Sequence, residues 1–266
     1  MMEKPRIKIF ARSFDLKLYR ISRRLYEGLQ DADGRPIPCV RLVDQTADGY
    51  FRTMLKDRDC DIAVNVDEDA FITDPQAVLD LIDAVIQGGY ANAGYSEAMR
   101  GNDPRVTNPF FNVFNLALIR TKYTPEALVR RLDDPEPYYP FFRWLAETFP
   151  VLYLPSHLHA DGITTVAEDL QGRTVCLHTW YSRFYSMPAW MVRRIDPAGA
   201  QKQRIDAVIR EAYAVRALPL PVFSATDRAA FFGNKVLRWI VKVPQRISRW
   251  PYKLYRRLAR KKTPKP

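Results

Sequence analysis

The stretch CDIAVNVDEDAFITDP, residues 60–75, joins an apolar run directly to three consecutive carboxylates. The run at 62–66 has the length and composition of a strand that is buried on both faces. Asp67, Glu68 and Asp69 follow it without a break. Because side chains alternate along extended backbone, Asp67 and Asp69 point to one side and Glu68 to the other. The segment therefore aims a pair of acids from the end of a buried strand.

Strand-like and helix-like patterns alternate through the first 180 residues around this segment. We expect strands at 6–12, 38–43, 61–66, 111–119, 151–155 and 173–180. We expect helices at 14–28, 48–59, 74–89 and 137–149. The helix at 74–89 has an Asp cap, a proline at its first position and a Gly-Gly stop. Such alternation predicts an α/β domain whose largely parallel or mixed sheet is flanked by helices. Ligands of these sheets bind beyond the carboxyl ends of the strands, where Asp67 and Asp69 lie.

Charge is distributed unevenly along the 266 residues. Thirteen of the 41 Lys and Arg residues lie between Arg228 and Pro266, where there is no Asp or Glu. Residues 1–227 thus hold 28 cations against 30 acids, so the net charge of +11 belongs to the tail. The amino terminus has no apolar core of signal-peptide length, so secretion is not expected. The three cysteines are expected to be buried thiols in a reducing compartment.

The basic tail also carries an apolar stripe at helical spacing, and Pro244 and Pro251 divide it into shorter pieces. The stripe comprises Phe232, Val236, Ile240, Val243, Ile247, Trp250, Leu254 and Leu258. No run approaches the roughly 20 apolar residues of a spanning helix. Cations beside an apolar stripe favour a helix lying in the interface of an anionic membrane, through residues 228–262. A basic helix packed on the body of the protein, or a partly disordered tail, is the alternative.

We expect three parts in the chain. Residues 1–190 form the α/β domain that contains the acids after 62–66, residues 191–227 a helical connector packed on it, and residues 228–266 the membrane-associating tail. This organisation implies a cytoplasmic protein that is peripheral on the inner face of the cell membrane.

Two neighbouring carboxylates repel each other unless a cation lies between them. Hard oxygen ligands at the mouth of a sheet suit Mg²⁺ or Mn²⁺, which commonly bridges to the phosphates of a substrate. The alternative is a solvated acidic turn that caps the helix starting near Pro75. The continuous apolar strand before the acids and the pair Phe71-Ile72 after them favour the metal site.

At this point the sequence resembles the nucleotide-sugar-dependent glycosyltransferases with the GT-A fold, of the type that builds bacterial surface polysaccharides. NVDEDAFI is similar to their DxD segment, and IKIFARSF to the strand that cradles the nucleotide. FFNVFNLALI is similar to a later strand, although Phe114 stands where glycine is frequent. LHTWYSR is similar to the late His-containing segment that returns to the metal. The resemblance covers residues 5–190, and it implies that residues 1–190 are the nucleotide-sugar-binding catalytic domain.

The resemblance implies a GT-A-like, Rossmann-like fold and a metal-dependent transfer of a sugar from a nucleoside-diphosphate donor. The acceptor is expected to be a polysaccharide, another glycan or a lipid-linked molecule at the membrane. The implied ligands of Mn²⁺ or Mg²⁺ are Asp67, Asp69 and His178. The implied nucleotide-sugar contacts are Ala11, Arg12, Ser13, Asp67, Asn112, Asn115 and Arg183.

A catalytic base is harder to find in the sequence. An inverting transferase needs a carboxylate that takes the proton of the acceptor hydroxyl, whereas a retaining enzyme need not have one. The candidates are Asp161 and the pair Glu168-Asp169, of which we name Asp161 and Asp169, and Asp161 is preferred because it closely follows the expected strand at 151–155. Both are also ordinary turn or capping residues.

Three other functions fit part of the pattern. A DxD phosphatase of the haloacid-dehalogenase type has its motif in the first strand, with Thr or Val at the position of Phe71. A sugar-nucleotide pyrophosphorylase would have a glycine in the loop ARSFDLKLYR, which has none. A nucleic-acid-binding protein could use the tail, whose cations would bind phosphates and whose aromatic residues could stack on bases. No nucleic acid is expected as partner if the tail binds a membrane.

Overall fold

The computed structural model describes residues 4–43, 49–130, 134–187, 189–237 and 240. The chain divides into two compact units, Met1–Pro221 and Val222–Pro266. The first unit contains strands and helices in alternation, and its main sheet is mixed and flanked by helices. The α/β class expected from the sequence is confirmed.

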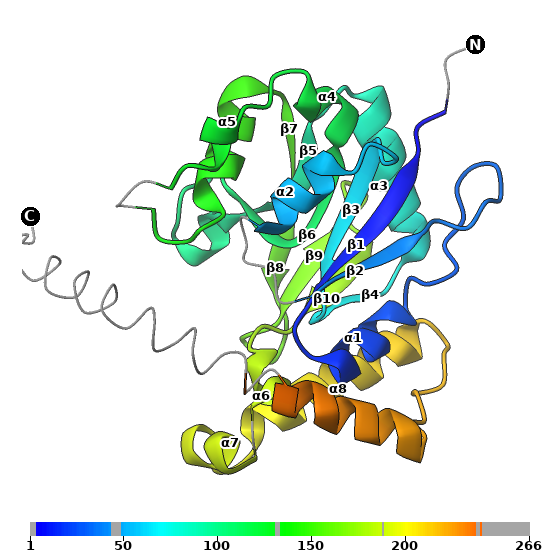
Figure 1. Cartoon of the computed structure of the whole chain (residues 1–266), viewed down its shortest axis with the longest axis vertical. Coiled ribbons are helices and arrows are strands. Elements are labelled where there is room, and N and C mark those ends of the chain that lie inside the picture. Colours follow the sequence, from blue (N-terminus) through cyan, green and yellow to red (C-terminus); the bar gives the residue numbers. More distant parts are fainter. Residues whose placement is uncertain (1–3, 44–48, 131–133, 188, 238–239, 241–266) are drawn as a thin grey trace, which may run out of the picture. The chain divides into compact units, whose positions relative to one another are not determined.

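The main sheet of the first unit has six strands in the order β2-β1-β3-β6-β5-β7 (Figure 1). The strands are β1 Ile7–Ser13, β2 Cys39–Val43, β3 Ile62–Asp67, β5 Asn92–Ser96, β6 Thr107–Asn115 and β7 Val151–Leu154. β1 is parallel to both β2 and β3, while β6 runs antiparallel between β3 and β5. β3 is therefore central and buried along its whole length, as its apolar run predicted.

Helices cover both faces of this sheet. The first unit contains α1 Leu16–Arg23, α2 Gly49–Lys56, α3 Pro75–Gln87, α4 Leu116–Arg120, α5 Tyr139–Thr148, α6 Arg183–Ser186, α7 Ala189–Ile195 and α8 Ala200–Val215, with 3-10 turns at Glu97–Arg100 and Pro125–Leu128. Figure 1 shows α2 and α3 on opposite sides of the sheet. α3 begins as predicted, because Asp74 accepts a hydrogen bond from the amide of Ala77 and Pro75 is the first helical residue.

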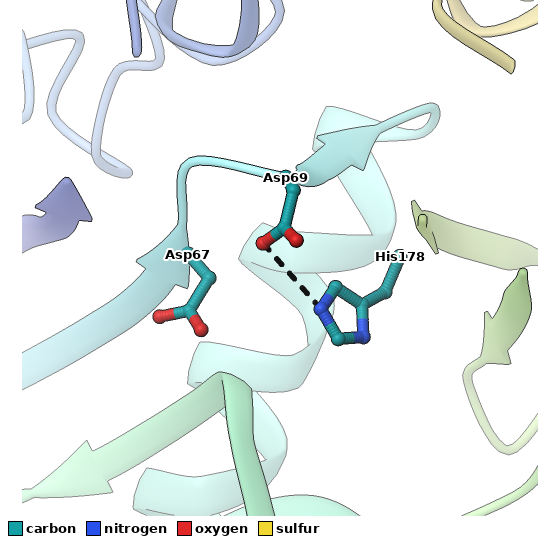
Figure 2. Close-up of side chains that lie close together, drawn as sticks. All are labelled: Asp67, Asp69 and His178. Atoms are coloured by element: carbon teal, nitrogen blue, oxygen red, sulfur yellow. Dashed lines mark ion pairs between the residues drawn. The ribbon is translucent and has the colours of Figure 1, made fainter. Parts of the chain in front are cut away.

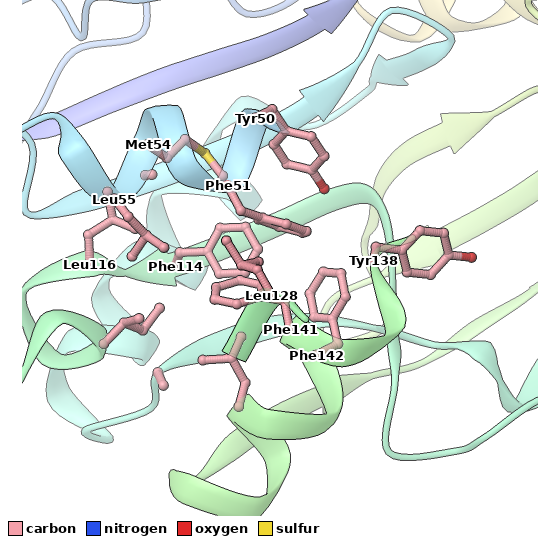
Figure 3. Packing of buried hydrophobic residues seen from close by; sticks show 14 of the residues in the cluster. Tyr50, Phe51, Met54, Leu55, Phe114, Leu116, Leu128, Tyr138, Phe141 and Phe142 are labelled. Carbon is pink, nitrogen blue, oxygen red and sulfur yellow. The ribbon is translucent and has the colours of Figure 1, made fainter. Parts of the chain in front are cut away.

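An aromatic core fastens α2 and α5 to one face of the sheet (Figure 3). The ring of Phe51 in α2 lies 4.3 Å from that of Phe141 and 5.2 Å from that of Phe142, both in α5. It also meets Phe114 of β6 edge to face at 5.8 Å. Offset and edge-to-face pairs of this kind add to the free energy of burial. The core fixes one wall of the region beyond the end of β3.

A second sheet begins immediately after the carboxylates. It has four antiparallel strands in the order β4-β10-β9-β8. They are β4 Ala70–Ile72, β8 Ser156–Leu158, β9 Thr165–Glu168 and β10 Thr174–His178. α8 contacts β4 and β10, and the hydroxyl of Tyr213 in α8 donates to the carbonyl of Ile21 at 2.7 Å. Short strands such as β4 and β8 carry too few residues for a periodic pattern, and they were not predicted.

The structure corrects the strand expected at 111–119. β6 ends at Asn115, and residues 116–120 form α4. The side chain of Asn115 accepts a hydrogen bond from the amide of Leu118 at 3.0 Å, which caps the new helix. An apolar run alone does not separate a buried strand from a buried helix, so the boundary had to come from this cap.

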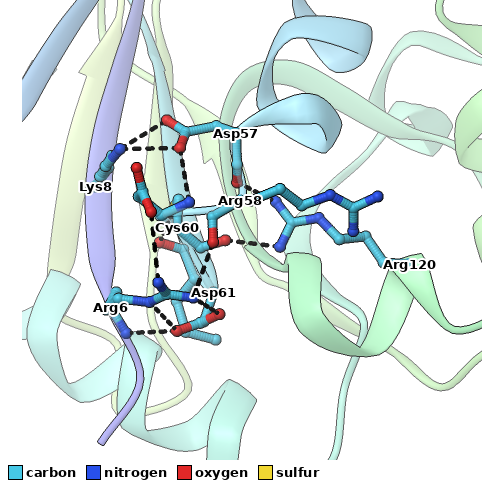
Figure 4. Close-up of polar contacts among 9 residues, drawn as sticks. Arg6, Lys8, Asp57, Arg58, Cys60, Asp61 and Arg120 are labelled. Atoms are coloured by element: carbon cyan, nitrogen blue, oxygen red, sulfur yellow. Dashed lines mark hydrogen bonds and ion pairs between the residues drawn. The ribbon is translucent and has the colours of Figure 1, made fainter.

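Ion pairs tie the amino-terminal ends of β1 and β3 together (Figure 4). Arg6 binds both carboxylate oxygens of Asp61, and Lys8 binds Asp57 at 2.8 Å. Arg120 donates four hydrogen bonds to backbone carbonyls in the last turn of α2 and in the segment 57–61 that connects α2 to β3. These contacts join β1, β3 and α2 at the amino-terminal ends of the two strands. The carboxylates lie at the opposite, carboxyl end of β3.

The three cysteines are free thiols, as expected. Cys60 and Cys176 are buried, whereas Cys39 is partly exposed. Burial raises the pKa of the Cys60 thiol to about 12, which keeps it protonated and unreactive. The redox compartment stays a prediction.

The second unit contains a helix over 225–237. Phe232, Val236, Leu237 and Ile240 are exposed, and three of them belong to the apolar stripe of the tail. Ile240 is described, but residues 238–239 and 241–266 lie outside the described residues, as do the two prolines and most of the expected cations. None of the described helices combines the length and the apolar composition needed to cross a bilayer.

Candidate metal and nucleotide site

The three consecutive carboxylates are all buried at the end of β3. Asp67 is 7% exposed, Glu68 2% and Asp69 6%. A solvated acidic turn would leave them open to water, so burial argues against that alternative. A buried carboxylate is costly unless hydrogen bonds or an opposite charge compensate it, and each of the three has a different partner.

Asp67 is compensated by Arg12 of the neighbouring strand. The two residues are register partners in the parallel pair β1–β3, so their side chains lie side by side on one face. Arg12 Nε donates to Asp67 Oδ1 at 2.8 Å, and a second guanidinium nitrogen donates to Oδ2. Burial raises the pKa of Asp67, and the charge of Arg12 offsets part of that rise. The guanidinium also lies over the ring of Tyr50, 5.3 Å from its centre.

Glu68 points the other way and is held by backbone. The amides of Phe14 and Asp15 donate to Glu68 Oε2 at 2.7 and 2.6 Å. Burial raises the pKa of Glu68 to about 8, and the charges of Asp69 and Asp15 add to the rise. Glu68 therefore fixes the loop between β1 and α1, while Asp15 caps that helix through the amides of its first turn.

Asp69 meets His178 through the pairing of β4 with β10. His178 is the register partner of Ala70, which places its ring beside Asp69. The distance from His178 Nε2 to Asp69 Oδ1 is 3.5 Å, and the amide of Ser182 donates to Asp69 Oδ2 at 3.3 Å. Burial would raise the pKa of Asp69, but His178 and Arg12 outweigh it and the pKa lies below its ordinary value.

Two carboxylates and one imidazole thus converge (Figure 2). One ligand atom from each of Asp67, Asp69 and His178 lies within 4.8 Å of the others, and all three residues are buried. The predicted ligand set is brought together from segments more than 100 residues apart. Oxygen and imidazole donors suit Mn²⁺ or Mg²⁺, and a divalent cation would relieve the repulsion between the acids.

Two aromatic rings, which also contact each other, pack against the imidazole. Phe110 stacks on His178 with 4.3 Å between ring centres, and Trp180 lies on it at 4.2 Å. Trp180 and Tyr181 have positive φ values of 58° and 59°, which non-glycine residues rarely adopt. The amide of Thr179 donates to the carbonyl of Asp69 at 3.0 Å, and this bond helps to hold the turn. Backbone strain of this kind is typical of functional sites.

The cluster faces a cavity of about 280 Å³. Its lining comprises Arg12, Asp67, Asp69, Asn108, Pro109, Glu136, Tyr138, His178, Trp180 and Ser182. The side of the cavity away from the metal ligands thus carries an amide, a phenol and a carboxylate. Sugar hydroxyls and phosphate oxygens are bound by polar groups of this kind.

Glu97 organises that polar wall from behind. Its carboxylate is 1% exposed and accepts hydrogen bonds from Asn102 at 2.8 Å, from Asn108 and from the hydroxyl of Tyr138 at 3.0 Å. Two residues of the lining, Asn108 and Tyr138, are therefore held by one buried anion. Removing it would leave several buried polar groups without partners, so Glu97 positions the wall without touching the cavity.

The predicted nucleotide contacts are placed in different parts of the sheet. Arg12 lines the cavity, while Ala11 is buried beside it and Ser13 accepts a hydrogen bond from Arg41 at 3.0 Å. Asn112 is buried within the sheet, bonded to Thr107 and to the carbonyl of Asn108.

Asn115 pairs with Ile62 at the opposite end of β3 from Asp67, because β6 runs antiparallel to β3. The structure therefore does not bring Asn115 to the cavity. Arg183 begins α6, is exposed, and lies over the ring of Tyr181 at 5.1 Å. It does not belong to the described lining of the cavity.

The two residues predicted as catalytic bases, Asp161 and Asp169, both stabilise turns of the backbone. Asp161 accepts bonds from the amides of Ile163 and Thr164 and an ion pair from Arg204. Burial raises the pKa of Asp161, but the hydrogen bonds from Thr164 outweigh that effect and lower the pKa to about 2. Asp169 accepts from Gln171 and Arg173 in the hairpin between β9 and β10.

The hairpin of Asp169 lies at the other end of β10 from His178. Both acids are saturated with donors, and neither lines the cavity. The structure therefore does not bring Asp161 or Asp169 to the site.

Sequence reasoning missed Asn108, Glu136, Tyr138 and Ser182. Glu136 and Tyr138 stand just before α5 in the segment PEPYYP, which was interpreted as the start of a helix. A charged and an aromatic residue before a helix are too common to signal a site. The alignment of Arg12 with Asp67, by contrast, follows from pairing IKIFAR with IAVNVD in parallel.

Comparisons with known proteins give weak likenesses. No protein-family model matches the chain, and no curated protein matches it. The fold is similar to the protein A197 from STIV, at 15% identity over 64% of this chain and 93% of that chain, with a TM-score of 0.39.

A glycosyltransferase involved in the glycosylation of the major capsid of PBCV-1 is similar at 14% identity over 56% of this chain and 80% of that chain, with a TM-score of 0.35. The mannosyltransferase PcManGT from Pyrobaculum calidifontis, solved with GDP-Man and Mn²⁺, is similar at 9% identity over 96% of this chain and 84% of that chain, with a TM-score of 0.42. Likenesses at this level do not assign a family, and the chemistry rests on the residues of the site.

The raised pKa of Glu68 has a consequence for stability. The folded protein keeps the Glu68 carboxyl protonated up to about pH 8, whereas a free glutamate releases its proton near pH 4.5. Glu68 therefore contributes its full stabilisation of the fold below about pH 4.5, and this contribution is lost as the pH rises towards 8. Glu68→Gln should remove this slope, which is at most about 1.4 kcal/mol per pH unit.

Urea unfolding of both proteins from pH 5 to 8 measures the difference. The exposed Glu147 provides a matched control, and Glu147→Gln should follow the wild type. Parallel stability curves for Glu68→Gln and the wild type would show that Glu68 is ionised in the folded protein.

Proposed function

We propose that this protein is a metal-dependent glycosyltransferase. It transfers a sugar from a nucleoside-diphosphate donor to a hydroxyl of a glycan or lipid-linked acceptor. The observation that carries the proposal is the buried cluster of Asp67, Asp69 and His178, which faces a cavity whose lining also includes Arg12, the carboxylate of Glu136 and uncharged polar and aromatic side chains.

The residues fit a divalent cation. Asp67 and Asp69 offer hard oxygen ligands and His178 offers Nε2, while its buried Nδ1 has no hydrogen-bond partner among the described residues. When bound, Mn²⁺ or Mg²⁺ stabilises the negative charge that develops on the diphosphate as the sugar–phosphate bond breaks. Arg12 is placed to add a second cation for the same diphosphate. Burial of the cluster strengthens these interactions, because the local dielectric is low.

Other residues of the lining suit the sugar and the acceptor. Trp180 and Tyr138 present aromatic surface, and Asn108 presents an amide that Glu97 holds in place. Glu136 is the carboxylate of the described lining that is left once Asp67 and Asp69 are assigned to the metal. In an inverting transfer, Glu136 is therefore our candidate for the base that accepts the proton of the attacking hydroxyl. It replaces Asp161 and Asp169 in that role.

Binding of a nucleoside diphosphate should require the metal ligands. We expect UDP or GDP to bind at least about tenfold more tightly with Mn²⁺ than without it, and Asp69→Ala to abolish that gain. Isothermal titration calorimetry over a panel of nucleoside diphosphates measures both. Asp80→Ala is the control, because Asp80 is a partly exposed acid of α3 that pairs with Arg173 and does not line the cavity. Equal affinities with and without Mn²⁺ across the panel would refute the proposal.

Glu136 should affect turnover more than donor binding. If it is the base, Glu136→Gln should lower the rate of sugar transfer by roughly 10²–10⁴-fold, because the amide cannot accept the proton. The affinity for the donor nucleotide should change little. The measurement compares kcat with the dissociation constant of the nucleotide, and Glu147→Gln in the neighbouring helix is the control. An unchanged kcat in Glu136→Gln would exclude this role.

The proposal extends to the basic tail, which would hold the enzyme on the cytoplasmic face of the membrane, near a lipid-linked acceptor. The exposed Phe232, Val236 and Leu237 on the helix at 225–237 support it. Replacing these three with serine keeps every charge but removes apolar area, so partitioning onto anionic vesicles should fall at least about tenfold.

Co-sedimentation with anionic and neutral vesicles measures this partitioning. Deleting residues 228–266 should release the protein and leave donor hydrolysis intact. If the serine variant sediments like the wild type, or if high salt alone abolishes binding, the tail acts as a polycation and nucleic-acid binding becomes the better explanation.

A further inference from the structure

We propose that the guanidinium of Arg12 pairs with Asp67 when no metal is bound, and turns to the diphosphate when metal and donor bind. Arg12 would then make the binding of the two ligands cooperative, because the metal must displace it and the diphosphate gives it a new partner. This inference rests on the proposed function and specifies how the site discriminates against a metal without its substrate.

The geometry of the ion pair supports a competition. The guanidinium uses Nε and one terminal nitrogen to grip both oxygens of Asp67, and the two side chains are only 16% and 10% exposed. This bidentate grip occupies the carboxylate that the metal needs. A divalent cation and the guanidinium sharing Asp67 in a buried site would repel each other strongly.

The summed charge of the buried groups around the metal ligands returns to its starting value only when metal and diphosphate are both bound. Asp67, Asp69 and Arg12 sum to one negative charge, counting His178 as the neutral imidazole that binds metal, and the exposed Glu136 of the cavity lining lies outside this buried set. A divalent ion alone changes this sum to one positive charge in a buried site, with Arg12 still beside it. A diphosphate brings negative charge for both the ion and Arg12. The site is therefore matched to a metal–diphosphate, and not to a metal alone.

Arg12 also has the freedom that such a movement requires. Among the described residues, the guanidinium donates hydrogen bonds to Asp67 alone, and Arg12 lines the cavity. It otherwise rests on the face of Tyr50, over which a planar guanidinium can slide. Arg120 shows the contrast, because its guanidinium donates four bonds to backbone carbonyls and is fixed in the fold.

The competing explanation is that Arg12 is a permanent support that orients Asp67 for the metal. The two explanations predict opposite changes in the affinity for Mn²⁺ when Arg12 is replaced. If Arg12 competes with the metal, its removal strengthens binding of Mn²⁺ alone, whereas loss of a support weakens it. The matched control is Arg6, which forms a similar fork with Asp61 between the same two strands, at the far end of the sheet (Figure 4).

The experiment titrates the full-length wild type, Arg12→Gln and Arg6→Gln with Mn²⁺ alone, and then titrates the Mn²⁺-saturated proteins with inorganic pyrophosphate. Free Mn²⁺ is followed by electron paramagnetic resonance and pyrophosphate binding by calorimetry. For Arg12→Gln we expect Mn²⁺ alone to bind at least about fivefold more tightly, and pyrophosphate at least about tenfold more weakly. Arg6→Gln should match the wild type in both titrations.

The possible outcomes separate the two levels of the proposal. Mn²⁺ affinity in Arg12→Gln that equals or falls below the wild-type value overturns the inference about Arg12 and leaves the proposed function standing. Absence of Mn²⁺ binding in both proteins overturns the proposed function and the inference with it. Arg12→Met keeps a long unbranched side chain at this buried position without the charge, and provides the same test if the glutamine variant does not fold.

Discussion

The burial of three consecutive carboxylates at the end of β3 is the constraint on which the rest of the first unit depends. Each acid needs compensation, and alternation of side chains sends them in different directions. Asp67 takes a guanidinium from β1, Glu68 takes two amides from the loop that follows β1, and Asp69 takes an imidazole from the end of β10 and an amide from the turn after it. The acids therefore fix where two distant segments of the chain, 12–15 and 178–182, must lie. Their mutual repulsion also leaves the site matched to a cation.

The second sheet brings His178 to the carboxylates and so completes the cluster. β4 begins immediately after Asp69, and its antiparallel pairing with β10 sets His178 beside that acid. Phe110 stacks on the imidazole, Trp180 packs against it at a tilt, and Thr179 binds the carbonyl of Asp69. A change of register by one residue in the pairing of β10 would turn His178 to the other face of the sheet. The geometry of the cluster thus depends on a few backbone hydrogen bonds between short strands.

The opposite wall of the cavity has a different origin. Glu97 binds Asn108 and Tyr138 from behind, and the aromatic core around Phe51 fastens α5, which follows Tyr138. This wall contributes an amide, a phenol and the single carboxylate of Glu136, whereas the wall at the end of β3 contributes the paired acids, Arg12 and the imidazole. A donor diphosphate and a sugar acceptor differ in the same way, so the two walls suit the two halves of a transfer reaction.

The sequence by itself determined the α/β class, the end of β3, the cap of α3 and the acids that need a cation, because these depend on local periodicity and on neighbours in the chain. The resemblance of LHTWYSR to a metal-returning segment also pointed to His178. Only the tertiary structure decided that Asn115 caps a helix far from the cavity, that Asp161 is saturated in a turn, and that Glu136 lines the site. These outcomes depend on strand order, on register and on which donors reach each carboxylate, and such long-range contacts leave no periodic trace in the sequence.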